Sequence, residues 1–134
     1  MENQWQNLVE YIINNYKNSS KIVEVGVGKI LEPSEKLREK LPNTEIISVD
    51  LYPANETVTK DDITNPNPTL YSNTDLIYSI RPPEELQPYI IKLAKQFDTD
   101  ILIKPLSTEE ININLQPRLK LVNYKKMALY VYNK

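Results

Sequence analysis

The residues best suited to contact a ligand through bare main chain are two glycines that follow a short apolar run. Gly26 and Gly28 come directly after Lys21–Val25, and they are the only glycines among the 134 residues, where average usage of about 7% would give roughly nine. Glycine tolerates positive φ and lets another group approach the backbone. Because the other turns are made with Pro, Asn and Asp, this pair favours a turn that faces a ligand.

The other candidates for chemistry are carboxylates, since the chain contains neither histidine nor cysteine. Thiolate metal sites, a cysteine nucleophile and an imidazole base are therefore excluded. Asp50 follows a second apolar segment, and Asp61 and Asp62 follow a third. An oxygen-only metal site among these three acids has no supporting spacing motif. Asp50 could instead cap a turn, and Asp61-Asp62 could form an Asx-type turn.

Composition and length indicate an ordinary globular protein. The chain is 40% hydrophobic and 25% charged, with a net charge of −2, which argues against wholesale binding to nucleic acid or membranes. No apolar run approaches the roughly 18 residues of a membrane span, and the start shows no signal-peptide pattern. We expect a cytoplasmic protein with one domain over residues 1–134.

Strand-like and helix-like segments alternate along most of the chain. Apolar residues recur at helical spacing over residues 2–17, beginning with Trp5 and ending with Tyr16. Further helices are expected from Pro33 to Asn43, after Pro82-Pro83, and over residues 107–113, while residues 65–71 should form a loop. The expected strands are Lys21–Val25, 44–49, 56–59, 75–80, 100–103, 119–124 and 127–132.

This alternation predicts the fold class. Strand–helix–strand units give a mainly parallel sheet that is covered on both faces, and the last two strands, joined at Lys125-Lys126, should form an antiparallel hairpin. We predict an α/β protein with an open, doubly wound, mainly parallel Rossmann-like sheet and a C-terminal antiparallel hairpin.

Four segments carry a resemblance to the class I S-adenosylmethionine-dependent methyltransferase fold, and more closely to an uncharacterised archaeal family of short Rossmann-like proteins. They are Val23-Glu24-Val25-Gly26-Val27-Gly28, Val49-Asp50-Leu51, Asp61-Asp62-Ile63 and the run from Leu76 to Pro83. The terminal hairpin is also methyltransferase-like, whereas an NAD-binding Rossmann domain does not require it. The resemblance implies that S-adenosylmethionine binds at Glu24, Gly26, Gly28, Asp50, Leu51, Asp62 and Ile63.

The implied roles agree with the general position of ligands in such sheets, outside the carboxyl ends of the strands. The glycines would face the amino acid end and the ribose of the cofactor, and Glu24 would organise the site directly or through water. Asp50, 22 residues beyond Gly28, could accept both ribose hydroxyls. Asp62 would accept from the adenine amino group, and Ile63 would cover the ring.

The third glycine of a dinucleotide site is absent. Ile30 occupies its place, and Pro33 delays the following helix, so a pyrophosphate would be poorly bound. S-adenosylmethionine has no phosphate and tolerates this arrangement better. An NAD-binding oxidoreductase is therefore a distant third reading, behind a methyltransferase and a non-catalytic cofactor- or nucleotide-binding module or degenerate scaffold.

The catalytic candidates are Arg81, Pro82 and Pro83. The resemblance to amino-methyltransferases would place an acidic or amide residue before two prolines and an aromatic residue after them, but here Arg81 and Glu84 flank the pair. Arg81 could bind a carboxylate or phosphate of an acceptor, or it could pair with Glu84 or Glu85. The acceptor is unknown, and RNA or a protein is the more plausible partner for so short a chain.

The basic end of the chain, from Arg118 to Lys134, has two interpretations. It could touch phosphates, or its charges could simply protect an edge strand from aggregation.

Overall fold

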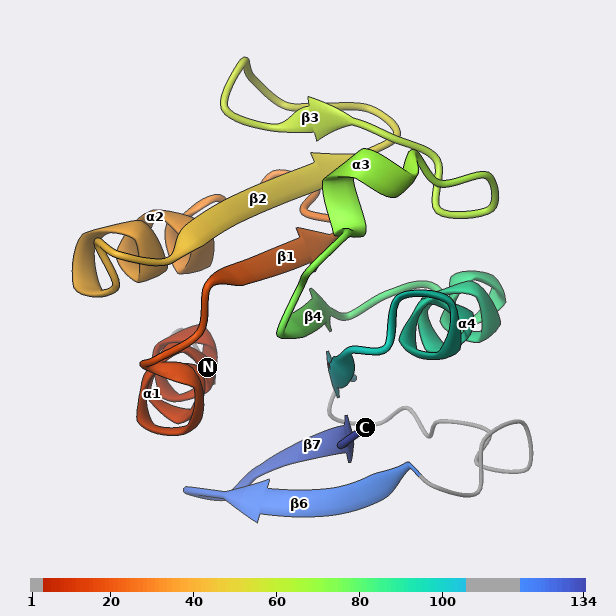
Figure 1. Cartoon of the computed structure of the whole chain (residues 1–134). Helices are drawn as coiled ribbons and strands as arrows, with labels where there is room; N and C mark the ends of the chain where they lie inside the picture. Colours follow the sequence, from red (N-terminus) through yellow and green to blue (C-terminus); the bar gives the residue numbers. More distant parts are fainter. Residues whose placement is uncertain (1–3, 106–118) are drawn as a thin grey trace.

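The computed structural model describes residues 4–105 and 119–134 as a single sheet with helices on both sides (Figure 1). The strands are β1 (Lys21–Val25), β2 (Glu45–Asp50), β3 (Thr59–Lys60), β4 (Leu76–Ile80), β5 (Asp100–Lys104), β6 (Lys120–Tyr124) and β7 (Met127–Tyr132). The helices are α1 (Gln4–Tyr16), α2 (Glu32–Lys40), α3 (Pro68–Tyr71) and α4 (Gln87–Phe97), with the 3-10 turn η1 (Glu84–Leu86) before α4. The helix expected over residues 107–113 lies outside the described residues.

The seven strands lie in the order β3-β2-β1-β4-β5-β7-β6. β1 to β5 are parallel, β7 pairs antiparallel with β5, and β6 pairs antiparallel with β7. The predicted fold class, mainly parallel with a C-terminal hairpin, is confirmed. The chain changes direction across the sheet between β1 and β4, which is the point where open α/β sheets bind ligands.

Two apolar clusters lie on the two faces of the sheet, because alternate residues of each strand point to opposite sides. On one face α1 and α2 bury residues such as Leu8, Ile12 and Leu37 against the sheet. On the other face α3 and α4 contribute residues such as Tyr71 and Ile90. Figure 1 shows the two helix pairs on opposite sides of the strands.

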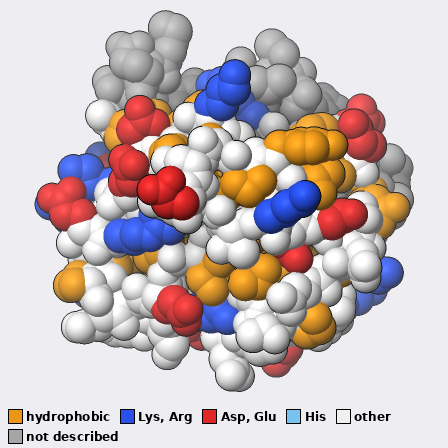
Figure 2. All heavy atoms as spheres, turned by 90° about the horizontal axis from the view of Figure 1, so that it is seen from above, with side chains coloured by type: hydrophobic (Ala, Val, Ile, Leu, Met, Phe, Trp, Pro, Cys, Tyr) orange, Lys and Arg blue, Asp and Glu red, His pale blue; other side chains and the backbone are white. Residues whose placement is uncertain are grey.

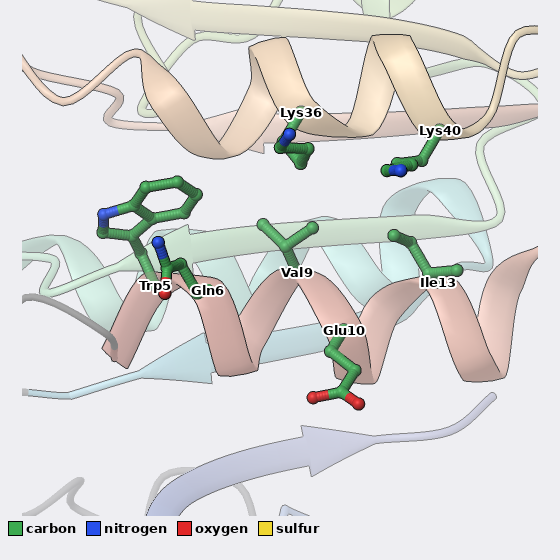
Figure 3. A pocket seen from close by; sticks show the side chains of 7 residues that line it. All are labelled: Trp5, Gln6, Val9, Glu10, Ile13, Lys36 and Lys40. Atoms are coloured by element: carbon green, nitrogen blue, oxygen red, sulfur yellow. The ribbon is translucent and has the colours of Figure 1, made fainter.

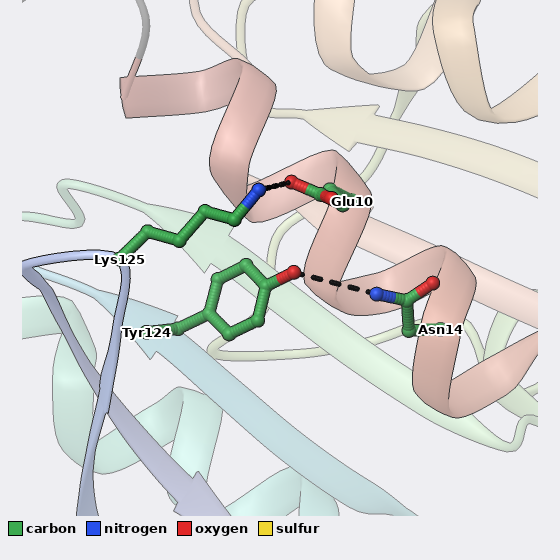
Figure 4. Close-up of polar contacts among 4 residues, drawn as sticks. All are labelled: Glu10, Asn14, Tyr124 and Lys125. Atoms are coloured by element: carbon green, nitrogen blue, oxygen red, sulfur yellow. Dashed lines mark hydrogen bonds and ion pairs between the residues drawn. The ribbon is translucent and has the colours of Figure 1, made fainter.

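Polar contacts join α1 to the terminal hairpin (Figure 4). Lys125 Nζ lies 2.7 Å from Glu10 Oε1, and Asn14 Nδ2 donates to the Tyr124 hydroxyl at 3.3 Å. The Tyr124 ring also meets Tyr11 edge to face, with centroids 5.3 Å apart. The first helix and the last two strands therefore stabilise each other although they are far apart in sequence.

Most of the predicted elements are confirmed, but two short ones are corrected. The strand expected over residues 56–59 is instead the two-residue β3, because Asn55 forms an Asx turn with Thr57 (Asn55 Oδ1 to Thr57 N, 2.8 Å). The loop expected over residues 65–71 contains α3, which begins where Asn67 Oδ1 caps the amide of Thr69 at 3.1 Å. Side-chain caps decided both corrections.

Within residues 4–105 and 119–134, no helix combines the length and the apolar composition needed to cross a membrane.

Candidate functional site

The turn after β1 has the backbone conformation that requires glycine. Gly26 and Gly28 have φ of 69° and 63°, where an L side chain costs roughly 1–2 kcal/mol. Space is not the constraint, since a Cβ on Gly26 would lie 3.7 Å from Ser79 Oγ and one on Gly28 would meet nothing within 4 Å. The Gly26 amide donates to the Val49 carbonyl at 3.0 Å. The turn therefore lies across the end of β2.

Asp50, the last residue of β2, links this turn to the next connection. Its Oδ2 accepts the Gly28 amide at 2.7 Å, and its Oδ1 accepts the Tyr52 amide at 2.8 Å. The expected turn-capping role is thus observed. Each carboxylate oxygen has two lone pairs, so each oxygen can still accept one further hydrogen bond from a ligand.

A pocket of about 270 Å³ opens beside Asp50 at the carboxyl ends of the strands. The backbone at Gly26 and the segments Asp50–Tyr52 and Asp61–Ile63 line it, together with Pro83 and Leu86 after β4. It therefore brings together Gly26, Asp50, Leu51, Asp62 and Ile63 from the predicted site. Gly28 adjoins it through its bond to Asp50.

Glu24 does not line this pocket, although it was assigned to the site. Its side chain is 1% exposed and points toward the face covered by α1 and α2, where the Tyr78 hydroxyl donates to its Oε1 at 2.7 Å. The pKa of Glu24 is raised to about 8, mainly by burial and also by the nearby charge of Asp50, while the Tyr78 hydrogen bond and the charge of Arg38 act in the opposite direction. The Glu24 carboxyl is therefore buried beside Tyr78 and does not form part of the pocket wall.

The two acids after β3 have different local roles. Asp61 uses both carboxylate oxygens within the chain, since Oδ1 accepts the Asn67 amide at 3.1 Å and Oδ2 accepts the Tyr71 hydroxyl at 2.7 Å. Asp62 forms the Asx turn weighed for it, with Oδ1 accepting both the hydroxyl and the amide of Thr64. These bonds lower the pKa of Asp62. Contacts within residues 4–105 and 119–134 engage Oδ1 alone, which leaves Oδ2 for a ligand.

The three catalytic candidates, which follow β4, lie in three different environments. Pro83 lines the pocket, Pro82 is buried, and Arg81 is exposed with φ of 54°. The Arg81 amide donates to the Lys104 carbonyl at 2.6 Å. The pairing of Arg81 with Glu84 or Glu85 does not occur among the described ion pairs, which are Lys36–Glu39 and Lys125–Glu10.

Sequence reasoning missed two residues around this site. Tyr52 lines the pocket with 80% of its side chain exposed, and the only signal for it was its position two residues after Asp50. Lys104 ends β5 as a 5% exposed cation, whose pKa is lowered by burial and by the charge of Arg81. Its position at a strand end was the available signal, but a lysine there gave no indication of burial.

Two surface features bear on what this region can bind. Among the described residues no group of three or more Asp or Glu side chains is arranged to hold a metal ion. The face seen from the β3 side carries acidic, basic and hydrophobic side chains interspersed (Figure 2). That face therefore lacks the single-sign field that steers a polyanion.

The order and directions of the strands place the protein in the methyltransferase-like α/β fold class. The structure is similar to the crystal structure of an S-adenosyl-L-methionine methyl transferase from Silicibacter pomeroyi, with a TM-score of 0.63 and 13% identity, covering 98% of this chain and 92% of that one. It is also similar to TrmN from Thermus thermophilus, with a TM-score of 0.63 and 13% identity, covering 97% of this chain and 51% of that one. At these identities the likeness shows the fold.

The sequence assigns the chain to a particular family. Residues 5–134 match the uncharacterised protein family UPF0146, and the chain belongs to it. The UPF0146 protein of Methanothermobacter thermautotrophicus is 35% identical over 128 residues, covering 96% of this chain and 94% of that protein. The UPF0146 protein of Methanocaldococcus jannaschii is 37% identical over 143 residues, covering 95% of each. The resemblance to an archaeal family of short Rossmann-like proteins is confirmed.

Proposed function

We propose that the pocket at the ends of β1, β2 and β3 binds S-adenosylmethionine and that the protein is a small methyltransferase-like enzyme. The observation that carries the proposal is the carboxylate of Asp50, which lies in the pocket wall and is fixed by the amides of Gly28 and Tyr52. Similarity to solved methyltransferases of the same fold supports it.

The groups around the pocket match the parts of the proposed ligand. The remaining lone pairs of Asp50 suit the two ribose hydroxyls, because charge-assisted hydrogen bonds to a fixed carboxylate are strong. Asp62 Oδ2 suits the adenine amino group, and Ile63 with Leu51 offers apolar surface to the ring. The exposed main chain at Gly26 leaves room for the amino acid end.

The same geometry disfavours a dinucleotide. A pyrophosphate binds best at a helix N-terminus with free amides, but α2 begins with Glu32 and has Pro33 and Glu35 in its first turn. The two carboxylates would repel a phosphate, and the proline removes an amide donor. This arrangement supports S-adenosylmethionine over NAD.

In the proposed reaction, the residues of this chain would hold the cofactor and the acceptor in the correct orientation. When bound, S-adenosylmethionine supplies an electrophilic methyl group, and orienting an acceptor in line with it provides most of the acceleration. The chain has no histidine, so the acceptor should be nucleophilic without a general base. Pro83 lines the pocket, and Arg81 lies two residues before it in the sequence. These two residues would contact the acceptor.

A specific observation favours a second function, a non-catalytic cofactor-binding module. Arg81 and Glu84 stand where amino-methyltransferases would supply an amide or acid and an aromatic residue, and Arg81 points its main-chain amide at Lys104. A protein of this type would bind the cofactor and act through a partner, either RNA or protein.

Isothermal titration calorimetry with S-adenosylmethionine, S-adenosylhomocysteine and NAD tests the proposal. We expect both sulfur ligands to bind, and Asp50→Asn to weaken S-adenosylhomocysteine binding about tenfold or more, since bonds to a charged group contribute roughly 1.5–3 kcal/mol. Asp98→Asn, at an exposed helix end away from the pocket, is the matched control. Unchanged affinity in a folded Asp50→Asn variant, or preferential NAD binding, would refute the assignment.

If S-adenosylhomocysteine binds, the enzyme and the non-catalytic module are separated by a second measurement. Transfer of a labelled methyl group to archaeal RNA or protein fractions supports the enzyme. Binding without transfer to either fraction supports the module. No binding of any of the three ligands leaves a scaffold that has lost the site.

A further inference from the structure

A largely apolar groove of about 260 Å³ lies between α1 and α2 and shares no lining residue with the cofactor pocket. Trp5, Val9 and Ile13 form its α1 wall, each four residues after the last (Figure 3). Lys36 and Lys40 form its α2 wall, also four residues apart, with their side chains directed toward α1 (Figure 3). One wall is therefore an apolar ridge and the other a cationic ridge.

The charge of the groove is positive on its α2 side. Lys36 lies 3.2 Å from Glu39, but both side chains are well exposed, at 43% and 63%, so water competes with that pair. Lys40 has no ion pair with any residue of the described ranges. Glu10 points away from the lysines and is engaged by Lys125 on the hairpin (Figures 3 and 4). The acid on the rim is thus neutralised by another element.

The spacing of the two ridges defines the shape of an occupant. The apolar ridge extends from Trp5 to Ile13, eight residue steps or about 12 Å of helix, and the two lysines are about 6 Å apart along α2. An amphipathic helix that lies in such a groove presents apolar anchors at i, i+4 and i+7. Acidic residues four apart on its flank would then match the lysine spacing. Trp5, which is half-buried at one end, is the residue type that most often anchors interfaces.

We propose that the groove between α1 and α2 is a docking site for a short acidic amphipathic helix of a partner protein. The apolar anchors of that helix lie against Trp5 and Ile13, over the buried Val9 between them, and its carboxylates face Lys36 and Lys40. The site is on different elements from the cofactor pocket, so it does not depend on the proposed function.

The natural partner is replaced in the test by two synthetic peptides. One is a tryptophan-free peptide of about four helical turns with leucines at i, i+4 and i+7 and glutamates on the flank. The other is identical except that lysines replace the flanking glutamates. Trp5 is the only tryptophan of the chain, so its fluorescence reports directly on the groove.

The expected result is a saturable change of Trp5 fluorescence with the glutamate peptide. The variant K36E/K40E should bind that peptide about tenfold or more weakly, which corresponds to 1.4 kcal/mol, and should prefer the lysine peptide instead. Both effects should shrink as salt screens the exposed charges. The control K17E/K95E carries the same charge change at exposed positions outside the groove and should bind as wild type does. Circular dichroism verifies that each variant is folded.

Three outcomes would overturn the proposal. One is no fluorescence response to either peptide, or an equal response to both. Another is a saturable response to octanoate that displaces the peptide, which would make the groove a site for small amphipathic anions. The last is concentration-dependent sedimentation that Ile13→Glu abolishes, which would make a second copy of this chain the occupant.

Discussion

Replacing Glu24 with glutamine should convert a pH-sensitive core into a pH-insensitive one. The carboxyl is 1% exposed, and its pKa is raised from the ordinary value of 4.5 to about 8, mainly by burial. Glutamine has the same size and keeps an oxygen that can accept the Tyr78 hydroxyl, which now lies 2.7 Å from Glu24 Oε1. The substitution therefore removes the ionisation and leaves the packing in place.

The sign and the size of the effect follow from the two pKa values of this carboxyl. Between pH 4.5 and about 8 the folded state keeps a proton on Glu24 that the unfolded chain releases, so wild type loses stability as the pH rises through this window. One pKa unit corresponds to about 1.4 kcal/mol. The accumulated loss is therefore roughly 4 kcal/mol at pH 8, and Glu24→Gln should not show it.

Urea unfolding of both proteins near pH 4.5 and near pH 8, followed by circular dichroism, measures this difference. Glu24→Gln should gain about 4 kcal/mol over wild type between the lower and the higher pH. A constant cost of burying the amide cancels in that comparison. Glu45→Gln, at the exposed start of β2, should show no such gain. If the difference between Glu24→Gln and wild type is the same at both pH values, the reasoning is wrong.

Four further substitutions test backbone geometry and hydrogen bonds, three of them beside the pocket and one away from it. Gly26→Ala and Gly28→Ala should each lower the free energy of unfolding by about 1 kcal/mol in thermal melts, and by similar amounts, because both need positive φ and neither lacks space; a much larger loss at one would show hidden crowding. Tyr71→Phe should cost about 2 kcal/mol, since the buried hydroxyl donates to Asp61 at 2.7 Å, and an unchanged melt would show that this bond does not stabilise the loop. Tyr16→Phe should cost about 1 kcal/mol in urea unfolding by losing its 2.7 Å bond to Asp100, with no effect on ligand affinity.

The long helices and strands could be predicted because their hydrophobic pattern and the residues at their ends indicate the same boundaries. β1 has the predicted bounds, Lys21–Val25, and the hairpin turns at Lys125-Lys126 as expected. Both lysines have positive φ, 50° and 67°, which a two-residue hairpin turn of type I′ requires. Sequence alternation located this turn even though lysine is not a typical residue for that conformation.

The short elements were not predicted because they are too short to show a periodicity, and tertiary contacts add to the local caps that shape them. β3 consists of two residues that pair with Val49 and Asp50, and no periodicity can appear over such a length. α3 is one turn whose last residue, Tyr71, is buried beside Phe97, with ring centroids 5.3 Å apart. That contact joins residues 26 positions apart, so local propensity carries no trace of it.

Topology alone predicts that the candidate site residues meet at one edge of the sheet. It does not predict which of the carboxylates are buried and which face the pocket. Parallel strands β1, β2 and β3 end at the same edge, so side chains after each of them had to meet there. Glu24 differs because a strand alternates its side chains, and one residue short of the strand end it points to the other face. The sequence motif alone gives no means of separating an acid that faces a ligand from an acid that is buried.

Asp50 shows that capping a turn and binding a ligand are compatible roles for a carboxylate at a strand end. Its bonds to the amides of Gly28 and Tyr52 are the turn cap that a structural role requires. The same bonds fix the orientation of both oxygens, and a preorganised acceptor loses less entropy when a ligand binds. A carboxylate that was free of local partners would bind the same hydroxyls less well. The cap is therefore a reason to expect ligand binding at Asp50, and the affinity of Asp50→Asn decides between a cap that also binds and a cap alone.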